Sequence, residues 1–238
     1  MSYIIIFIHK INCYYSYILA TIYDSTELRG CLFHWTQAIW RAVQRLGFQT
    51  AYYEKKDIYD VFRNIMGLPF LPSEFIIPQY NRLLAEYNVT GIFDMFDLYF
   101  RKQWLDNVNI PIKCWSVFDR IYRSNNNVEG WHNKLNTRAY HQTGLNMYKL
   151  IQLLYDESVD TSLTVKFLEG GVLSSTRRPQ YLNVDIAVNK AWQDFKDGNI
   201  TVKKLLAISS KVCIHYKLDI LNANIDIDSS EIDTTVYF

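Results

Sequence analysis

Apolar side chains recur at every third or fourth position along most of this chain, in segments separated by glycine, proline or short polar runs. This spacing is typical of amphipathic helices that cover a core. We expect helices over about residues 35–46, 58–66, 73–87, 91–105, 129–137, 145–155, 184–197 and 202–211. Residues 28–34 form a short apolar run instead, which predicts a buried strand that leads directly into the first helix.

Residues 2–23 are rich in isoleucine and tyrosine. A membrane-spanning helix needs about 18 uninterrupted apolar residues, and His9, Lys10 and Asn12 interrupt this run. A signal peptide would begin with positive charge, which the first residues lack. We therefore expect one or two strands here, in preference to a signal or anchor segment, and no membrane partner.

The composition excludes few classes of protein. With 238 residues, 49% of them hydrophobic, the chain can bury a sizeable core. The formal net charge of +1 leaves nucleic-acid binding to local clusters of basic residues. The four cysteines have no regular spacing, so we expect no disulfide framework and a reducing, intracellular compartment, either nucleus or cytoplasm.

The densest polar segment is Arg-Ser-Asn-Asn-Asn-Val-Glu-Gly-Trp-His, residues 123–132, between two apolar segments. It has the pattern of a helix start, because Asn126 can accept from the first-turn N–H groups and Glu129 can reach back to the N–H of the cap residue. The simplest interpretation of Glu129 is therefore a capping carboxylate that stabilises the helix by about 1 kcal/mol.

A second motif, far upstream, changes that interpretation. A C-x-x-H pair near the start of the chain is followed, much later, by Asn-Asn-x-x-Glu-x-x-His. In type and order the two motifs resemble the later part of the transposase domain of Mutator-like (MULE) elements, over about residues 27–149 and more weakly to about residue 216. The matching residues are Cys31, His34, Asn125, Asn126, Glu129, Trp131 and His132.

MULE transposases resemble the DDE transposases, which have an RNase H-like fold and cut DNA with two aspartates and one glutamate. The resemblance implies that Glu129 is the third catalytic carboxylate and a ligand of Mg²⁺. Two such ions about 4 Å apart hold the attacking and leaving oxygens, and need several carboxylate oxygens. The resemblance also implies a mainly α chain, namely the last strand, helical insertion and glutamate helix of an RNase H-like α/β domain, followed by extra C-terminal helices.

The chain departs from the family at the two aspartates, which the family places upstream of the C-x-x-H motif. The only carboxylates before Cys31 are Asp24 and Glu27, and neither lies where the family has its second aspartate. We therefore expect a remnant or incomplete form of a DNA transposase that is catalytically inactive by itself. A nuclease in which Asp24 and Glu27 replace the aspartates is a weaker alternative.

Cys31 and His34 also have the spacing of half a zinc site. Zinc needs about four ligands, and the candidates for the other two are His132, His141 or the Cys213–His215 pair. None of these candidates has a spacing characteristic of a zinc site. We favour a buried, structural Cys31 and His34 that lock the strand to the helix.

DNA is the partner that the resemblance implies, and basic residues near the motif helices are the expected contacts. They are Arg41, Arg45, Lys134, Arg138, Arg177 and Arg178. Arg177 and Arg178 can equally be solvent-exposed loop residues that contact only water. The alternative from a different class is a helical protein-interaction module that binds a full-length transposase or another nuclear partner, with part of its aromatic side chains exposed.

Five segments are expected along the chain. They are an apolar N-terminal segment (1–26), a partial transposase domain with its helical insertion (27–160), an exposed loop or linker (161–181), a C-terminal helical pair (182–217) and a disordered acidic tail (218–238). The aromatic side chains of residues 91–105 share one helical face, so we expect them in the core and not on a base-stacking platform.

Overall fold

The computed structural model describes residues 4–8, 26–124, 126–142, 144–171 and 179–212. This part of the chain is mainly helical, as predicted, and the chain divides into two compact units. The first unit is Met1–Ser124 with Ile186–Phe238, and the second is Asn125–Asp185. The predictions for residues 9–25, for Asn125, for residues 172–178 with Arg177 and Arg178, and for residues 213–238 with the Cys213–His215 pair lie outside the described residues. No helix within the described ranges is long and apolar enough to cross a membrane.

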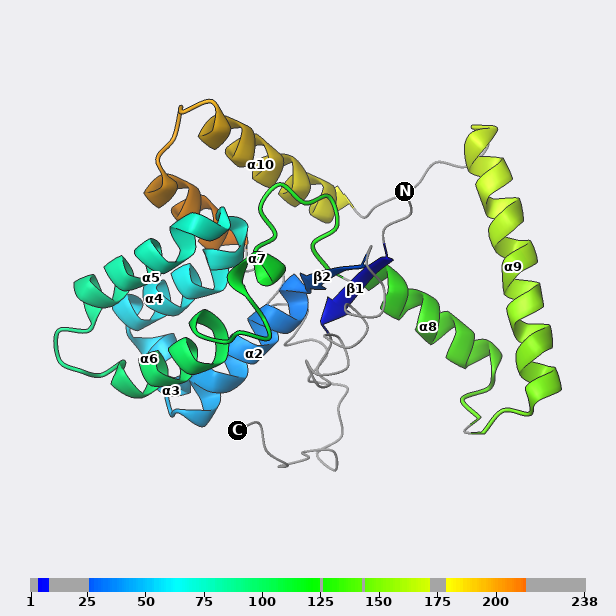
Figure 1. Ribbon diagram of the computed structural model, residues 1–238, viewed down its shortest axis with the longest axis horizontal. Coiled ribbons are helices and arrows are strands. Elements are labelled where there is room, and N and C mark those ends of the chain that lie inside the picture. The colour runs from blue at the N-terminus through cyan, green and yellow to red at the C-terminus, as the bar shows by residue number, and fades with distance from the viewer. Residues whose placement is uncertain (1–3, 9–25, 125, 143, 172–178, 213–238) are drawn as a thin grey trace. The chain divides into compact units, whose positions relative to one another are not determined.

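Two short strands near the start of the first unit pair in parallel (Figure 1). β1 (Ile4–Ile8) lies beside β2 (Thr26–Gly30), with Ile4 opposite Thr26 and Ile8 opposite Gly30. β1 consists of isoleucine and phenylalanine, whose branched and aromatic side chains favour extended backbone. A strand predicted within residues 2–23 is therefore present. The strand predicted over residues 28–34 is instead Thr26–Gly30, because residues 32–34 are already helical.

Helix α2 (Leu32–Arg45) follows β2 with one residue between them. That residue is Cys31, whose extended backbone places it at the N-cap. The helix begins three residues before the predicted start at Trp35, because the Leu32 side chain is buried and extends the apolar face. Gly47, with a φ of 78°, adopts the left-handed conformation that commonly follows the end of a helix.

The first unit continues as a block of short helices, several of which begin or end at the predicted glycine and proline positions. Its elements are α3 (Gln49–Glu54), α4 (Lys56–Gly67), the 3-10 turn η1 (Leu68–Phe70), α5 (Ser73–Tyr87), α6 (Asp94–Phe100), the π-helical turn η2 (Arg101–Leu105) and α7 (Ile112–Trp115). α4 and α5 contact each other and lie side by side in Figure 1. The helix predicted over 91–105 begins only at Asp94, because Gly91 has a φ of 72°.

Trp35 of α2 lies at the centre of the packing between α2, η2 and α7. Its ring stacks on Trp115, with ring centroids 4.4 Å apart, and meets Trp104 and Phe100 edge-on. The indole Nε1 donates to the carbonyl oxygen of Met66 at 3.2 Å. One side chain thus joins α2 to four other elements by ring contacts and by a buried hydrogen bond.

A second aromatic cluster lies between α4 and α6. Phe93 stacks on Phe48, with ring centroids 5.6 Å apart, and Phe96 meets Phe62 edge-on at 5.0 Å. Phe93, Phe96 and Phe100 are all buried. The prediction that the aromatic side chains of residues 91–105 form core is confirmed for these three.

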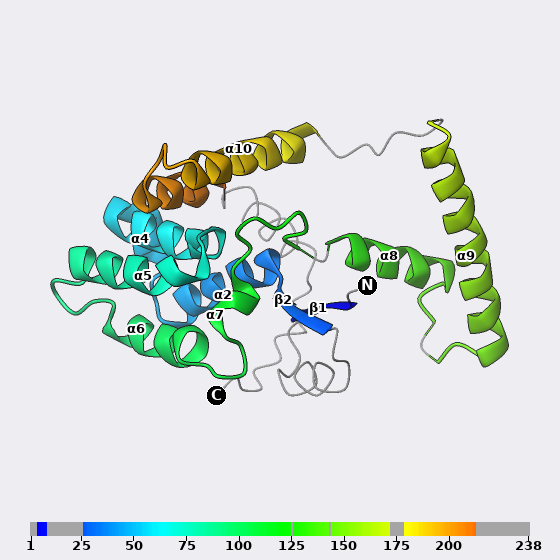
Figure 2. The same cartoon turned by 45° about the horizontal axis from the view of Figure 1, so that its top comes forward.

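The C-terminal helices pack on this block. Trp192 of α10 (Pro179–Lys196) donates its Nε1 proton to the Phe70 carbonyl oxygen at 2.9 Å. The buried Arg63 guanidinium of α4 donates to two carbonyl oxygens near the end of the helix over residues 202–212, which lies against α4 (Figure 2). The predicted C-terminal helical pair therefore belongs largely to the first unit, which the linear division into segments did not predict.

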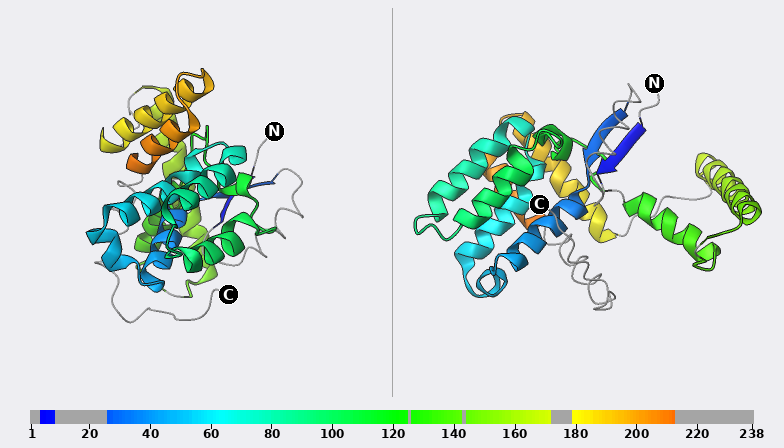
Figure 3. Two further views of the ribbon diagram at one scale, coloured as in Figure 1. Left: turned by 90° about the vertical axis from the view of Figure 1, so that its left-hand side faces the viewer. Right: turned by 60° about the horizontal axis from the view of Figure 1, so that its bottom comes forward.

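The second unit contains α8 (Asn126–Arg138) and α9 (Met147–Glu169), both visible in Figure 3. The prediction of a loop is wrong for residues 161–169, where α9 continues. No glycine or proline interrupts α9 before Gly170, and the hydroxyl groups of three serine and threonine residues donate to carbonyl oxygens one turn earlier. α10 likewise begins before the predicted residue 184, at Pro179, a residue that suits the first helical position.

Candidate functional site

Glu129 and its polar neighbours share one face of α8. At about 100° per residue, Glu129, Asn133 and Asn136 fall within roughly 60° of one another around the helix axis, and Lys134 and Arg138 fall roughly 140–180° from Glu129. Lys134 and Arg138 are the residues that contact α9. Glu129, which is half-buried, therefore lies on the face of α8 turned away from α9.

α8 begins three residues before the predicted residue 129, and Asn126, the predicted cap, is its first helical residue. The helix begins at Asn126, so the cap position falls on Asn125, which lies outside the described residues. Glu129 remains in the first turn, where a carboxylate interacts favourably with the helix dipole. Trp131 and His132 of the motif are both exposed, and their ring centroids are 5.1 Å apart.

A buried carboxylate of α9 binds the two basic residues of α8. Glu157 is 5% exposed, and its Oε1 and Oε2 atoms accept from Lys134 Nζ at 2.9 Å and from Arg138 Nη1 at 2.7 Å. Arg138 also pairs with Asp160 one turn later. Two of the predicted DNA contacts are thus already paired with two carboxylates within the second unit.

The pKa shifts of the Arg138–Asp160 pair follow from this contact. The hydrogen bond from Arg138 lowers the pKa of the Asp160 carboxyl and raises the pKa of the Arg138 guanidinium. A carboxyl with a lowered pKa stabilises the folded state above its ordinary pKa, and that contribution is lost as the pH falls through the lowered value. The pair is therefore fully ionised at neutral pH.

Arg41 and Arg45 are the two predicted DNA contacts in the first unit that the structure describes. They lie one turn apart on α2, and both are exposed. The Arg45 guanidinium lies over the Tyr99 ring, 5.0 Å from its centroid. This contact orients one arginine of the pair on the outer face of α2.

Cys31 and His34 lie at the junction between β2 and α2. Cys31 is buried, as predicted, and His34 is half-buried, with its ring 5.3 Å from that of Phe33 and perpendicular to it. No group of three or more His, Cys, Asp or Glu side chains is placed to hold a metal ion within the described ranges. Cys31 and His34 belong to the first unit and Glu129 to the second.

Sequence reasoning missed Glu157 and Asp160. Both lie between the end of the helix predicted over residues 145–155 and the start of the loop predicted at residue 161, so neither was assigned a partner. A signal was present: Lys134 and Arg138 are four residues apart, and Glu157 and Asp160 are three apart, which are the spacings of two facing helical surfaces.

Comparison of the chain with protein-family models, with curated proteins and with solved structures gives no match.

Proposed function

We propose that this chain is the C-terminal part of a MULE-type transposase domain, of RNase H-like ancestry, that binds DNA and does not cut it alone. The observation that supports the proposal is the orientation of Glu129. This carboxylate lies in the first turn of α8, on the face turned away from α9, with Asn133 beside it. A glutamate on this face can meet carboxylates from elsewhere in a complete domain.

The described residues do not fit the metal site of the complete family enzyme. Two Mg²⁺ ions need several carboxylate ligands, and Glu129 supplies one. Of the two upstream carboxylates, Glu27 is in β2, and Asp24 lies outside the described residues. No group of three or more His, Cys, Asp or Glu side chains that could hold a metal ion occurs among the described residues, which supports a chain that does not cut DNA alone.

Supercoiled plasmid DNA is expected to stay intact when the chain is added with Mg²⁺ or Mn²⁺. The physical reason is the incomplete carboxylate set around the Glu129 position. The measurement is conversion of supercoiled to nicked DNA on a gel, with Glu129→Gln as the matched variant. If the unmodified chain nicks DNA and Glu129→Gln abolishes the nicking, the proposal that the chain is catalytically inactive is wrong. That result would favour Asp24 and Glu27 as replacements for the two missing aspartates.

Arg41 and Arg45 are the stronger candidates for phosphate contact. Lys134 and Arg138 already bind Glu157 and Asp160, so a phosphate would have to compete with two carboxylates for them. Among the described residues, neither of the two exposed arginines on α2 forms an ion pair. A phosphate would therefore not have to displace a carboxylate from them. Arginine also suits phosphate because its planar fork can donate two parallel hydrogen bonds.

The double variant Arg41→Gln/Arg45→Gln is expected to weaken binding to duplex DNA by about tenfold, because each lost phosphate contact removes charge-assisted hydrogen bonds and counterion release. The measurement is fluorescence anisotropy with a labelled duplex at fixed salt. The matched control is Lys134→Gln/Arg138→Gln, which removes the same charge from α8. Equal losses in the two double variants, or no loss in either, would contradict the assignment to α2.

A second candidate function is the binding of a protein partner through α9. Much of this helix is apolar and exposed: Ile151, Leu154 and Tyr155 are 54%, 44% and 64% exposed, and Leu163 and Phe167 are 46% and 47% exposed. Soluble proteins rarely leave so many large apolar side chains on one element without a partner. Capture of a purified full-length transposase after nuclease treatment, together with absent duplex binding, would put this function in place of DNA binding.

A further inference from the structure

Arg63 of α4 carries a positive charge that is buried in the first unit. The residue is 3% exposed. Arginine is seldom buried to this degree unless an anion balances its charge, because the removal of an ion from water is costly. None of the ion pairs that the described residues form includes Arg63. The buried charge therefore favours an anionic partner from outside the described ranges.

The described partners of Arg63 are neutral groups. Its Nη2 atom donates to the carbonyl oxygens of Ser210 and of Lys211, the second at 3.2 Å. The guanidinium lies over the Tyr59 ring, with Cζ 5.8 Å from the ring centroid. Burial raises the pKa of the Tyr52 hydroxyl, and the neighbouring Arg63 charge partly opposes that rise. The buried Nη1 atom has no hydrogen-bond acceptor among the described residues, so one donor of the cation is left for a further acceptor.

The last described helix of the first unit ends beside this guanidinium. This helix, over residues 202–212, ends with Val212, which is 7% exposed. Its last turn also approaches α4 closely at Gly67, where a β-carbon would lie 3.0 Å from the Ser210 backbone nitrogen. Gly67 lies one turn after Arg63 on α4. The two contacts fix the end of the helix, so the chain leaves the described residues next to Arg63.

Asp219 is the first carboxylate after this helix. It lies outside the described residues, and the six residues 213–218 separate it from Val212. A connection of this length is common between packed elements, and a short loop costs less entropy to close than a long one. The next carboxylate, Asp226, follows only seven residues later. The neighbours of Asp219 are apolar, as is typical of buried positions, namely Leu218, Ile220 and Leu221.

We propose that the Asp219 carboxylate is the counter-ion of Arg63 and accepts a hydrogen bond from its Nη1 atom. A hydrogen bond between two ions is stronger than one between neutral groups, and a buried arginine requires such a partner. The chain after Val212 then folds back onto α4. The first unit therefore extends beyond its last described helix, and the acidic tail begins after Asp219. The inference does not depend on the proposed DNA binding.

The titration of the Asp219 carboxyl in the full chain tests this pairing directly. We expect its pKa to lie at least about one pH unit below the ordinary aspartate value of about 3.9, because an adjacent cation favours the charged form. Asp226 is the internal reference and should titrate near the ordinary value. The measurement is carbon-13 NMR of the side-chain carboxyl groups, assigned with Asp219→Asn and Asp226→Asn. A pKa of Asp219 at or above the ordinary value, or equal to that of Asp226, would overturn the proposal.

Asp219→Asn is also expected to speed amide hydrogen exchange in the helix over residues 202–212 by at least about tenfold, because it leaves Arg63 buried without a counter-ion. The matched control is Asp226→Asn, which removes the same charge and should leave this exchange unchanged. In the background Arg63→Met, which replaces the cation by an unbranched apolar side chain, Asp219→Asn should have no further effect. Equal acceleration by the two aspartate variants, or an undiminished effect of Asp219→Asn in Arg63→Met, would contradict the pairing. If Arg63→Met does not fold, the carboxyl titration of the unmodified chain decides the question.

Discussion

Replacement of Trp35 by alanine is expected to lower the free energy of unfolding of the first unit by about 3–5 kcal/mol. The change removes the stacking on Trp115 and the edge-on contacts with Trp104 and Phe100. It also removes the donor to the Met66 carbonyl oxygen, which becomes a buried acceptor that has lost its indole partner. The measurement is denaturant unfolding of the full chain, with hydrogen exchange of α2 and α4 amides to assign the loss to this unit.

The matched control is Leu98→Ala on α6, whose side chain is 65% exposed. An exposed substitution of this kind is expected to change stability by no more than about 0.5 kcal/mol. Trp35→Phe is a further comparison, because it keeps the ring contacts in part and removes only the hydrogen-bond donor. A loss in Trp35→Ala no larger than that in Leu98→Ala would contradict the central role of Trp35.

Replacement of Glu157 by glutamine is expected to destabilise the contact between α8 and α9 by about 1–3 kcal/mol. The neutral amide can no longer form ion pairs with Lys134 and Arg138, which currently meet both oxygens of a buried carboxylate. The loss stays moderate because the Lys134 and Arg138 side chains are 49% and 35% exposed and can turn to water. Hydrogen exchange of the α8 and α9 amides in the full chain measures it.

Asp156→Asn is the control for Glu157→Gln, since it removes one negative charge from the adjacent position of the same helix. Asp156 is exposed, and its Oδ1 accepts from Gln152 at 2.9 Å within α9. We expect little change in the exchange of α8 amides. Faster exchange of α8 in the control than in Glu157→Gln would show that Glu157 does not hold the two helices together.

Helices with a regular apolar stripe and a clear end could be predicted from the sequence. α2 and α5 were located because their buried residues recur at helical spacing, and the glycine after α2 marked its end. The length of α9 could not be predicted in this way. Its second half mixes threonine and serine with apolar residues on all sides, which resembles a loop until the hydroxyls are seen to donate within the helix.

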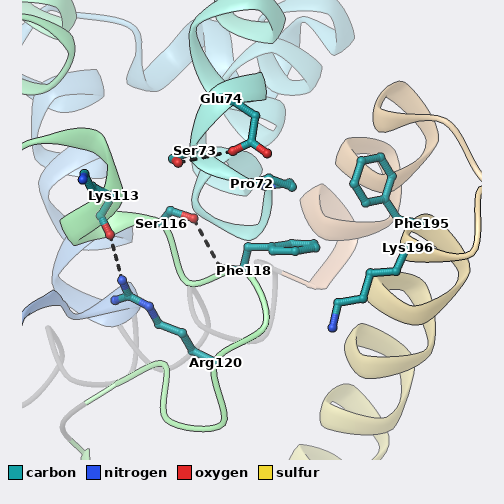
Figure 4. A pocket seen from close by; sticks show the side chains of 9 residues that line it. All are labelled: Pro72, Ser73, Glu74, Lys113, Ser116, Phe118, Arg120, Phe195 and Lys196. Atoms are coloured by element: carbon teal, nitrogen blue, oxygen red, sulfur yellow. Dashed lines mark hydrogen bonds between the residues drawn. The ribbon is translucent and has the colours of Figure 1, made fainter. Parts of the chain in front are cut away.

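The candidate sites depended on contacts between distant parts of the chain, which spacing alone does not give. Glu129 could be singled out by its motif, but its orientation depends on which face of α8 meets α9. Glu157 could be found only once Lys134 and Arg138 were seen opposite it. An open pocket in the first unit is lined by Ser73, Lys113 and Lys196, which are far apart in sequence, so no local pattern predicted it (Figure 4).

The measurement that tests the proposed DNA binding most directly is a salt titration of duplex affinity for the unmodified chain. If Arg41 and Arg45 each contact one phosphate, the logarithm of the association constant should fall linearly with the logarithm of salt concentration, with a slope of about −1.8 or steeper. An affinity that does not change with salt, or no duplex binding at low salt, would contradict the account.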